Sequence, residues 1–123
     1  MNKELKQKWV EALRSGKYKQ GKGVLRTFSD HFCCLGVLCN VLDDSKWRDA
    51  QTVETNIDGH QTEVVARIYG EGEGESSSTS LPVNLRERIG LHVADVSTLI
   101  AMNDTGDSFE TIAKHIEAKI GAE

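Results

Sequence analysis

Apolar side chains concentrate in residues 32–42, FCCLGVLCNVL, where Gly36 and Asn40 alone are neither apolar nor cysteine. These side chains would fall on every side of a helix or strand, so we expect protein to surround the segment. We predict a helix that begins at His31 behind a cap at Asp30, although so short an apolar run also fits a buried strand. Glycine weakens a helix, and we therefore expect Gly36 to allow another backbone to approach closely.

The spacing of apolar positions predicts further helices on both sides of this segment. One covers residues 3–14, and a short one covers residues 81–90, with proline near its start and glycine at its end. Another begins at Asp95 or Ser97. The last follows a cap at Ser108 and has its apolar side at Phe109, Ile112, Ala113, Ile116 and Ile120.

A different pattern occupies the middle of the chain. Val53, Thr55 and Ile57 alternate with polar residues, as on a half-exposed strand. We predict a small antiparallel sheet from residues 24–28, 52–57 and 61–69, with a type I′ turn at Asp58 and Gly59. Residues 70–80, GEGEGESSSTS, have no apolar side chain to offset the entropy of ordering, so we expect a flexible surface loop there.

These elements fit one domain spanning residues 1–123, because a chain of 123 residues can bury enough surface for a single core. The predicted fold class is α+β, with four or five helices around the buried helix at 32–42 and a small antiparallel sheet. The chain opens without a signal-peptide pattern, and no apolar run is long enough to span a membrane. We therefore expect a cytoplasmic protein without membrane contact.

The three cysteines, Cys33, Cys34 and Cys39, all lie in the apolar segment. An odd number of cysteines in such a segment is typical of reduced, buried thiols. Metal sites usually need pairs such as C-x2-C, and a catalytic thiol needs an exposed, electropositive setting. The sequence has neither pattern, so we predict no metal, no cofactor, no catalytic residue and no enzyme activity.

Charge is distributed unevenly along the chain. Residues 1–26 carry eight Lys and Arg against two Glu, although the whole chain has a net charge of −4. The loop KYKQGKG at residues 17–23, followed by Arg26, is the best candidate binding site, because glycines expose N–H groups and cations attract anions. The predicted ligand-binding residues are Lys17, Tyr18, Lys19, Gln20, Lys22, Arg26, Asn103 and Asp104. A solvated loop and a polar turn are the alternatives for these two stretches.

Residues 98–116 have the form of two helices of a helix-turn-helix motif. If the last helix were the recognition helix, it would present Glu110 and Glu117 to DNA phosphates, which is unfavourable. We therefore expect this helix pair to be a packing hairpin.

Three stretches carry a resemblance to a known group of proteins: WVEALRSGKYKQGKGVLR, HFCCLGVLCNVL and LIAMNDTGDSFETIAKHIE. They resemble the W-x-x-A-L-R-S-G-x-Y-x-Q-G, C-C-L-G-V-L-C and N-D-x-G-x-S-F motifs of small phage and prophage accessory proteins. The resemblance covers both ends, about half of the chain. It implies a mobile-element protein in the bacterial cytoplasm that binds, and so blocks or modulates, a host or defence protein.

Three function classes remain open at this point. The first is a binding protein whose partner is a host bacterial protein or an anionic small molecule such as a nucleotide. The second is a nucleic-acid-binding protein that uses the 17–26 loop, with an affinity that falls steeply as salt rises. The third is a small enzyme, for which the sequence shows no paired carboxylates and no triad. The sequence does not indicate an oligomeric state.

Overall fold

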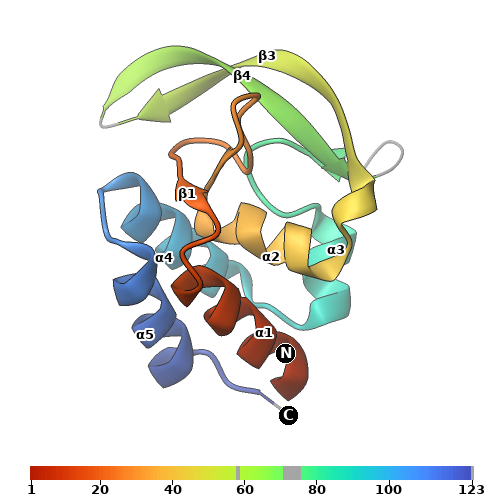
Figure 1. Cartoon of the computed structure of the whole chain (residues 1–123), viewed down its shortest axis with the longest axis vertical. Coiled ribbons are helices and arrows are strands. Elements are labelled where there is room, and N and C mark those ends of the chain that lie inside the picture. The colour runs from red at the N-terminus through yellow and green to blue at the C-terminus, as the bar shows by residue number, and fades with distance from the viewer. Residues whose placement is uncertain (58, 71–75, 123) are drawn as a thin grey trace.

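The computed structural model describes residues 1–57, 59–70 and 76–122. Among these residues there are five α-helices, which lie together below a long β-hairpin that arches across one end of the molecule (Figure 1). The two chain ends lie at the opposite end of the molecule from the hairpin. The predicted class, a single α+β domain with a small antiparallel sheet, is confirmed.

The helices are α1 (Lys3–Arg14), α2 (Cys34–Leu42), α3 (Val83–Ile89), α4 (Val93–Asp104) and α5 (Phe109–Lys119). Capping explains two of their starts: Asn2 Oδ1 accepts a hydrogen bond from Leu5 N–H at 3.0 Å, and Ser108 Oγ accepts one from Thr111 N–H at 3.2 Å. The predicted cap at Ser108 is therefore confirmed. Helix α4 begins earlier than predicted, with His92 rather than Asp95 or Ser97 at the N-cap position.

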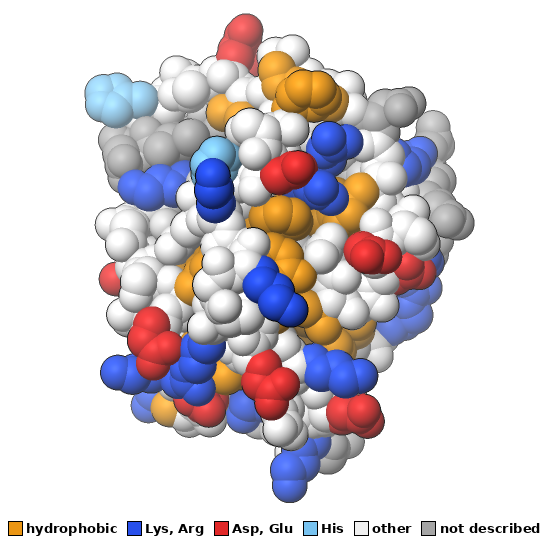
Figure 2. Space-filling model, viewed as in Figure 1, with side chains coloured by type: hydrophobic (Ala, Val, Ile, Leu, Met, Phe, Trp, Pro, Cys, Tyr) orange, Lys and Arg blue, Asp and Glu red, His pale blue; other side chains and the backbone are white. Residues whose placement is uncertain are grey.

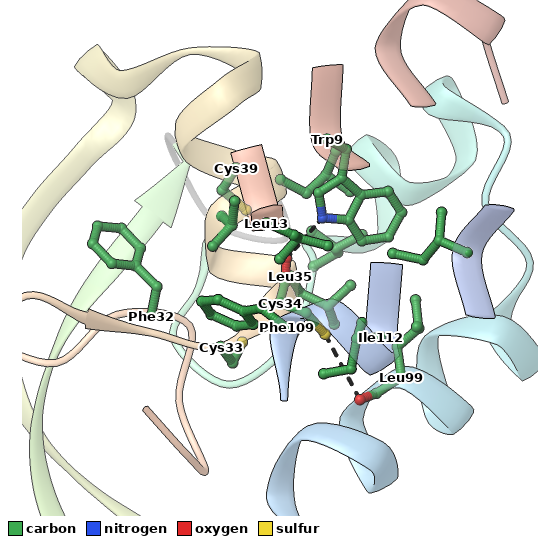
Figure 3. Close-up of a cluster of buried hydrophobic side chains, with 14 of the residues drawn as sticks. Trp9, Leu13, Phe32, Cys33, Cys34, Leu35, Cys39, Leu99, Phe109 and Ile112 are labelled. Carbon is green, nitrogen blue, oxygen red and sulfur yellow. Dashed lines mark hydrogen bonds between the residues drawn. The ribbon is translucent and has the colours of Figure 1, made fainter. Parts of the chain in front are cut away.

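Helix α2 is the centre of the core, as predicted. Its residues from Cys34 to Cys39 are all buried. Figure 3 shows side chains from α1, α4 and α5 gathered around it, and the indole N–H of Trp9 donates to the Cys34 carbonyl at 2.9 Å. Buried contact on every side explains why this segment is apolar all round.

The start of α2 differs from the prediction. Residues His31–Phe32 form a short strand, β2, which pairs in parallel with β1 (Lys19–Gln20). The helix begins only at Cys34, and the Cys33 thiol accepts a hydrogen bond from the Gly36 N–H at 3.4 Å. Asp30 does not cap the helix; it adopts φ 65° in the turn before β2. Its acidic side chain is used elsewhere, as described below.

Gly36 plays the predicted role. A Cβ atom at this position would overlap the backbone carbonyl of Leu25, which passes directly beside the helix. The Leu25 carbonyl also accepts a hydrogen bond from Cys33 N–H at 3.1 Å. The backbone at Leu25 therefore packs directly against the backbone of α2 at Gly36.

The predicted hairpin is confirmed and is longer than predicted. Strands β3 (Trp47–Ile57) and β4 (His60–Gly70) pair from Ala50–Arg67 to Ile57–His60 without interruption, and a register shift separates Trp47 from Ala50. A short 3-10 helix, η1 (Asp44–Lys46), leads from α2 into β3. Gly59 has φ 81°, and Asp58 lies outside the described residues, so the turn type stays a prediction.

The other edge of β4 is covered in two places. Residues 26–28 lie beside it: Phe28 N–H donates to the Val65 carbonyl at 2.9 Å, and Arg67 N–H donates to the Arg26 carbonyl at 2.9 Å. The predicted strand at 24–28 does not form, because this stretch makes only two isolated bridges, Arg26 with Phe32 and Thr27 with Ala66. Further along, β5 (Ser76–Ser77) pairs with the end of β4.

Part of the loop predicted at 70–80 lies in regular structure, whereas its flexibility stays a prediction. Residues 76 and 77 form β5, and the Ser78 carbonyl accepts a hydrogen bond from Leu25 N–H at 2.8 Å. These backbone bonds order a polar segment without burying apolar side chains. The part of the predicted loop at residues 71–75 lies outside the described residues.

Candidate functional site

The basic connection, defined here as residues 17–26, runs from α1 to the strand β2 past the end of α4. It contains little regular secondary structure besides β1. Its backbone is nevertheless bonded along its length: Gly21 N–H donates to the Phe32 carbonyl at 2.8 Å, and Gly23 N–H donates to Asp104 Oδ1 at 3.0 Å. Because so many of its polar groups have partners, the connection has a defined shape.

Asn103 is the main anchor of the basic connection. It is completely buried near the end of α4. Its Oδ1 accepts from Gln20 Nε2 at 3.0 Å and from Cys34 N–H at 3.2 Å, and its Nδ2 donates to the Gly21 carbonyl at 2.7 Å. A further contact at 3.5 Å joins Nδ2 to Asp104 Oδ1. These bonds use the whole hydrogen-bonding capacity of an asparagine side chain.

Gln20 completes this polar cluster. Besides its bond to Asn103, its Nε2 donates to the Asp107 carbonyl in the turn after α4 at 2.7 Å. The predicted site residues Gln20, Asn103 and Asp104 are therefore brought together, as the sequence analysis expected of a shared site. Their hydrogen bonds are with each other and with backbone groups, so they position the connection.

The lysines of the connection are placed differently. Lys17 and Lys19 are exposed, and within the described part of the chain neither ammonium group makes an ion pair or hydrogen bond. Lys22 is half-buried, and its Nζ lies 4.0 Å from the position of a Cβ added to Gly106. The cationic side chains at 17 and 19 thus face solvent from a backbone that is held in place.

Tyr18 belongs to an aromatic chain that reaches into the hairpin. Its ring meets the Phe32 ring edge-on at 5.0 Å, Phe32 meets Trp47 at 6.1 Å, and Trp47 meets Tyr69 at 4.9 Å. Asn40 joins Tyr18 to Trp47, since its Nδ2 donates to the Tyr18 hydroxyl at 2.9 Å and its Oδ1 accepts from the Trp47 indole N–H at 3.0 Å.

Arg26 lies against the same rings. Its guanidinium carbon is 4.9 Å from the centre of the Phe32 ring and 5.3 Å from the Trp47 ring. It also pairs with Asp30 at 2.8 Å, and the same carboxylate oxygen lies 3.6 Å from Arg67 Nε. The charge of Arg26 is therefore partly neutralised, and Asp30, wrongly predicted as a helix cap, holds two arginines.

Figure 2 shows one face of the molecule, on which a broken strip of apolar side chains is flanked by both basic and acidic side chains. A hollow of about 300 Å³ lies next to Lys17 and Tyr18, and its other lining residues are Lys8, Glu11, Ala12, Ser15 and Val41. At this hollow Lys8 and Lys17 can attract an acidic group, and Tyr18 and Val41 offer apolar contact.

Sequence analysis missed Asn40 and Trp47 in this surface. Asn40 interrupts an apolar helix, which was a signal of a polar role for one side chain. No sequence pattern linked Trp47 to Tyr18, because the two are joined through Asn40 and Phe32 only once the hairpin packs against the helices.

The buried cysteines are poorly suited to catalysis. Burial raises the pKa of Cys33 to about 11, and it raises the pKa values of Cys34 and Cys39 well above the usual thiol value. All three are free, and Cys34 Sγ lies 3.7 Å from the Leu99 carbonyl (Figure 3). Protonated thiols are weak nucleophiles and weak metal ligands. The described residues contain no group of three His, Cys, Asp or Glu side chains arranged to hold a metal.

A larger groove, of about 790 Å³, lies between α1 and the C-terminal end of the chain. Arg14 closes part of it by pairing with Glu110 at 2.9 Å and with Glu117 at 2.7 Å. These hydrogen bonds raise the pKa of Arg14 and lower that of Glu117. The pairing joins α1 to α5 and accounts for the two carboxylates that the sequence analysis placed on the outside of the last helix.

The chain belongs to a family described as a domain of unknown function, DUF8296, whose profile matches residues 1–120. The match includes the basic connection, the buried helix and both C-terminal helices. No curated protein and no solved structure matches the chain. Within its described residues, no helix has the length and apolar character needed to cross a membrane.

Proposed function

We propose that this protein is a non-catalytic binding protein that recognises an acidic partner with the basic connection and the adjoining hollow at Tyr18 and Val41. The proposal depends on one observation: within residues 17–26, some groups anchor the backbone and others remain exposed to solvent. Gln20 and the backbone hold the connection against Asn103 and Asp104, whereas Lys17 and Lys19 stay exposed. A cationic surface that is ordered before binding loses less entropy when a partner docks.

The resemblance to phage and prophage accessory proteins supplies the biological setting of the proposal. In that setting the protein acts in the bacterial cytoplasm, and its partner is a host or defence protein that it blocks or modulates. The same cationic surface could instead bind an anionic small molecule, which would occupy the hollow beside Lys17 and Tyr18.

The chemistry of the described groups supports binding over catalysis. The raised thiol pKa values keep the three cysteines protonated near neutral pH. The lowered pKa values of Asp43 and Glu117 come from hydrogen bonds to Ser45 and Arg14, and they keep both carboxylates ionised. A general acid or base works best with a pKa near the working pH, and none of these groups is moved toward it.

The test compares two charge-reversal variants of equal charge. Lys17→Glu/Lys19→Glu changes the proposed surface, and Lys114→Glu/Lys119→Glu changes exposed residues of α5. Poly-L-glutamate, a short single-stranded DNA and ATP serve as anionic probes, with the fluorescence of Trp47 as a signal, because Trp47 is connected to Tyr18 through Asn40. We expect the first variant to weaken binding of poly-L-glutamate by at least about tenfold and the second to change it little.

The choice of probe separates the function classes. Preference for poly-L-glutamate supports an acidic protein partner, and preference for ATP supports a small anionic ligand. Preference for DNA, with a steep fall in affinity as salt rises, would replace the proposal by nucleic-acid binding. Equal losses in both double variants would overturn it, since binding would then follow net charge rather than this surface.

A further inference from the structure

The free edge of β3 is the largest set of unused backbone groups in the described sheet. The order of strands is β3-β4-β5, so β4 lies inside the sheet and β3 forms its edge. Residues 26–28 and β5 cover the other side of β4. Among the described residues, no segment pairs with the second side of β3, which is 11 residues long.

The hydrogen bonds of β4 show which groups of β3 point outward. Val65 and Arg67 direct their backbone groups toward residues 26–28, away from β3. In an antiparallel ladder, opposite residues alternate between hydrogen-bonded and non-hydrogen-bonded pairs. A β3 residue opposite a β4 residue whose backbone groups point away from β3 therefore directs its own N–H and C=O away from β4, toward the free edge. Val65 and Arg67 are opposite Thr52 and Ala50. The free edge therefore presents the N–H and C=O groups of Ala50, Thr52, Glu54 and Asn56.

This edge carries few of the features that prevent strand pairing. Edge strands are usually short, or carry lysine, proline or a bulge. From Ala50 to Ile57 the register is regular, and this stretch contains one charged residue, Glu54, and no proline. Thr52, Glu54 and Asn56 are exposed, and no hydrogen bond among the described residues uses their outward backbone groups.

The charge next to this edge selects the kind of strand that fits. Glu54 lies directly opposite Glu63, and both side chains are exposed on the same face of the hairpin. The two residues form a non-hydrogen-bonded pair, in which the Cβ atoms of opposite residues lie close together, and neither carboxylate makes an ion pair within the described residues. A strand docked on β3 would place one side chain beside Glu54, where lysine or arginine would relieve this repulsion.

We propose that the edge of β3 binds an extended segment of a partner protein as an additional antiparallel strand, with a basic side chain opposite Glu54. A second copy of this chain fits less well, because pairing β3 with itself would bring two more carboxylates into the same short stretch. The Thr55 hydroxyl donates to the Gly23 carbonyl of the basic connection at 2.9 Å. The outward backbone groups of β3 are nevertheless different groups from the exposed Lys17 and Lys19, so the edge can bind whether or not those lysines bind an acidic partner.

The test uses two end-blocked peptides of about nine residues, long enough to cover the free edge. One alternates valine with lysine, and the other alternates valine with glutamate. Thr52→Pro removes one outward N–H without removing a hydrogen bond between β3 and β4. Thr52→Ala is the matched control, because it loses the same side chain and keeps the N–H. Glu54→Lys reverses the local charge.

We expect the lysine peptide to bind at least about tenfold more tightly than the glutamate peptide, and Thr52→Pro to weaken its binding by a similar factor. Thr52→Ala should bind like the original protein, and Glu54→Lys should reverse the preference. In hydrogen exchange, the amides of Thr52, Glu54 and Asn56 should exchange quickly in the free protein and slowly with the lysine peptide bound. This readout also shows whether Thr52→Pro retains the β3–β4 pairing at Val53 and Thr55.

Three results would overturn the proposal. Equal binding by Thr52→Pro and Thr52→Ala would show general charge attraction without strand pairing. Absence of binding at about 1 mM peptide would show that the edge does not accept a strand. A dimer in analytical ultracentrifugation that Thr52→Pro abolishes would assign the edge to a second copy. The variant Lys17→Glu/Lys19→Glu should leave peptide binding at the edge unchanged or slightly stronger, which distinguishes this proposal from the proposed function.

Discussion

Residues 17–26 have almost no regular secondary structure, whereas the β3–β4 hairpin consists of two strands of 11 residues. The irregular connection is nevertheless anchored, because Asn103, Asp104 and the Phe32 carbonyl form hydrogen bonds with its backbone and side chains. The regular hairpin has one edge without a partner among the described residues. Regular structure satisfies backbone groups locally, but only tertiary contacts decide how firmly a segment is held.

The two regions also use charge differently. In the connection, the residues that anchor the backbone are neutral or acidic, and the exposed residues are lysines. In the hairpin, the two exposed glutamates at 54 and 63 oppose each other and do not help to hold it. Each region therefore presents a charged surface that folding does not require, one basic and one acidic. The predictions that follow test this contrast, beginning with the anchor of the connection.

Replacing Asn103 by alanine should cause the largest loss of stability. The change leaves the Cys34 N–H and the Gly21 carbonyl without a partner in a buried site, and each such group costs about 1–3 kcal/mol. We expect the free energy of unfolding to fall by about 3 kcal/mol in urea titrations. Asn56→Ala, on the exposed hairpin, is the matched control and should change it by less than about 0.5 kcal/mol. A similar loss of unfolding free energy in both variants would show that Asn103 anchors the connection no more than an exposed hairpin residue stabilises the fold.

Replacing Gly36 by alanine should have the next largest effect. The new methyl group would meet the Leu25 carbonyl, so either α2 or the end of the basic connection must move. Overpacking of this kind costs about 1–3 kcal/mol, and the better helix propensity of alanine recovers about 1 kcal/mol at most. We expect a net loss of about 2 kcal/mol in thermal or urea unfolding. Gly121→Ala, with no atom within 4 Å of the added Cβ, is the control and should have little effect.

The reaction rate of the Cys33 thiol should measure how often the end of the basic connection, at Leu25, separates from the start of α2. Its N–H is bonded to the Leu25 carbonyl, and burial raises its pKa to about 11. At pH 9 its thiolate fraction is therefore roughly 100-fold below that of a free cysteine. We expect a disulfide reagent such as DTNB to modify the native protein at least that much more slowly than the unfolded chain. Rapid modification under native conditions would mean that the connection opens easily. Asn103→Ala should accelerate the reaction.

Relieving the repulsion in the hairpin should have the smallest effect, and the opposite sign. Glu63→Gln removes one of two like charges that face each other across β3 and β4. We expect a gain in the free energy of unfolding of about 0.5 kcal/mol at low salt. Glu54→Gln should give the same gain, and the double variant should gain little more, because one substitution already removes the repulsion. The effect should disappear at high salt, since exposed charges are screened.

Much of the fold was predictable because the relevant signals are local. The apolar run at 32–42 predicted a buried helix, and the alternation before Gly59 predicted a strand pair, since both patterns depend on neighbours along the chain. The errors lay at boundaries. His31 and Phe32 form β2 instead of the first turn of α2, because the parallel pairing with β1 satisfies their backbone groups.

The candidate site was predictable only in part. Sequence analysis grouped Gln20 with Asn103 and Asp104, and the structure brings them into contact. It did not predict that these residues bind one another, nor that Arg26 lies against Phe32 and is paired with Asp30. Asn40 and Trp47 were missed, since the surface they form with Tyr18 joins three separate parts of the chain.

The sequence by itself determined the helices, the long hairpin and which helix is surrounded by protein, because hydrophobic spacing acts through residues close along the chain. Only the tertiary structure decided which polar groups are consumed in folding and which remain available to a partner. Asn103 meets Gln20 across 83 positions and Cys34 across 69, and no local pattern encodes such distances. The free edge of β3 has the same origin, since an edge exists only once every other strand has its place.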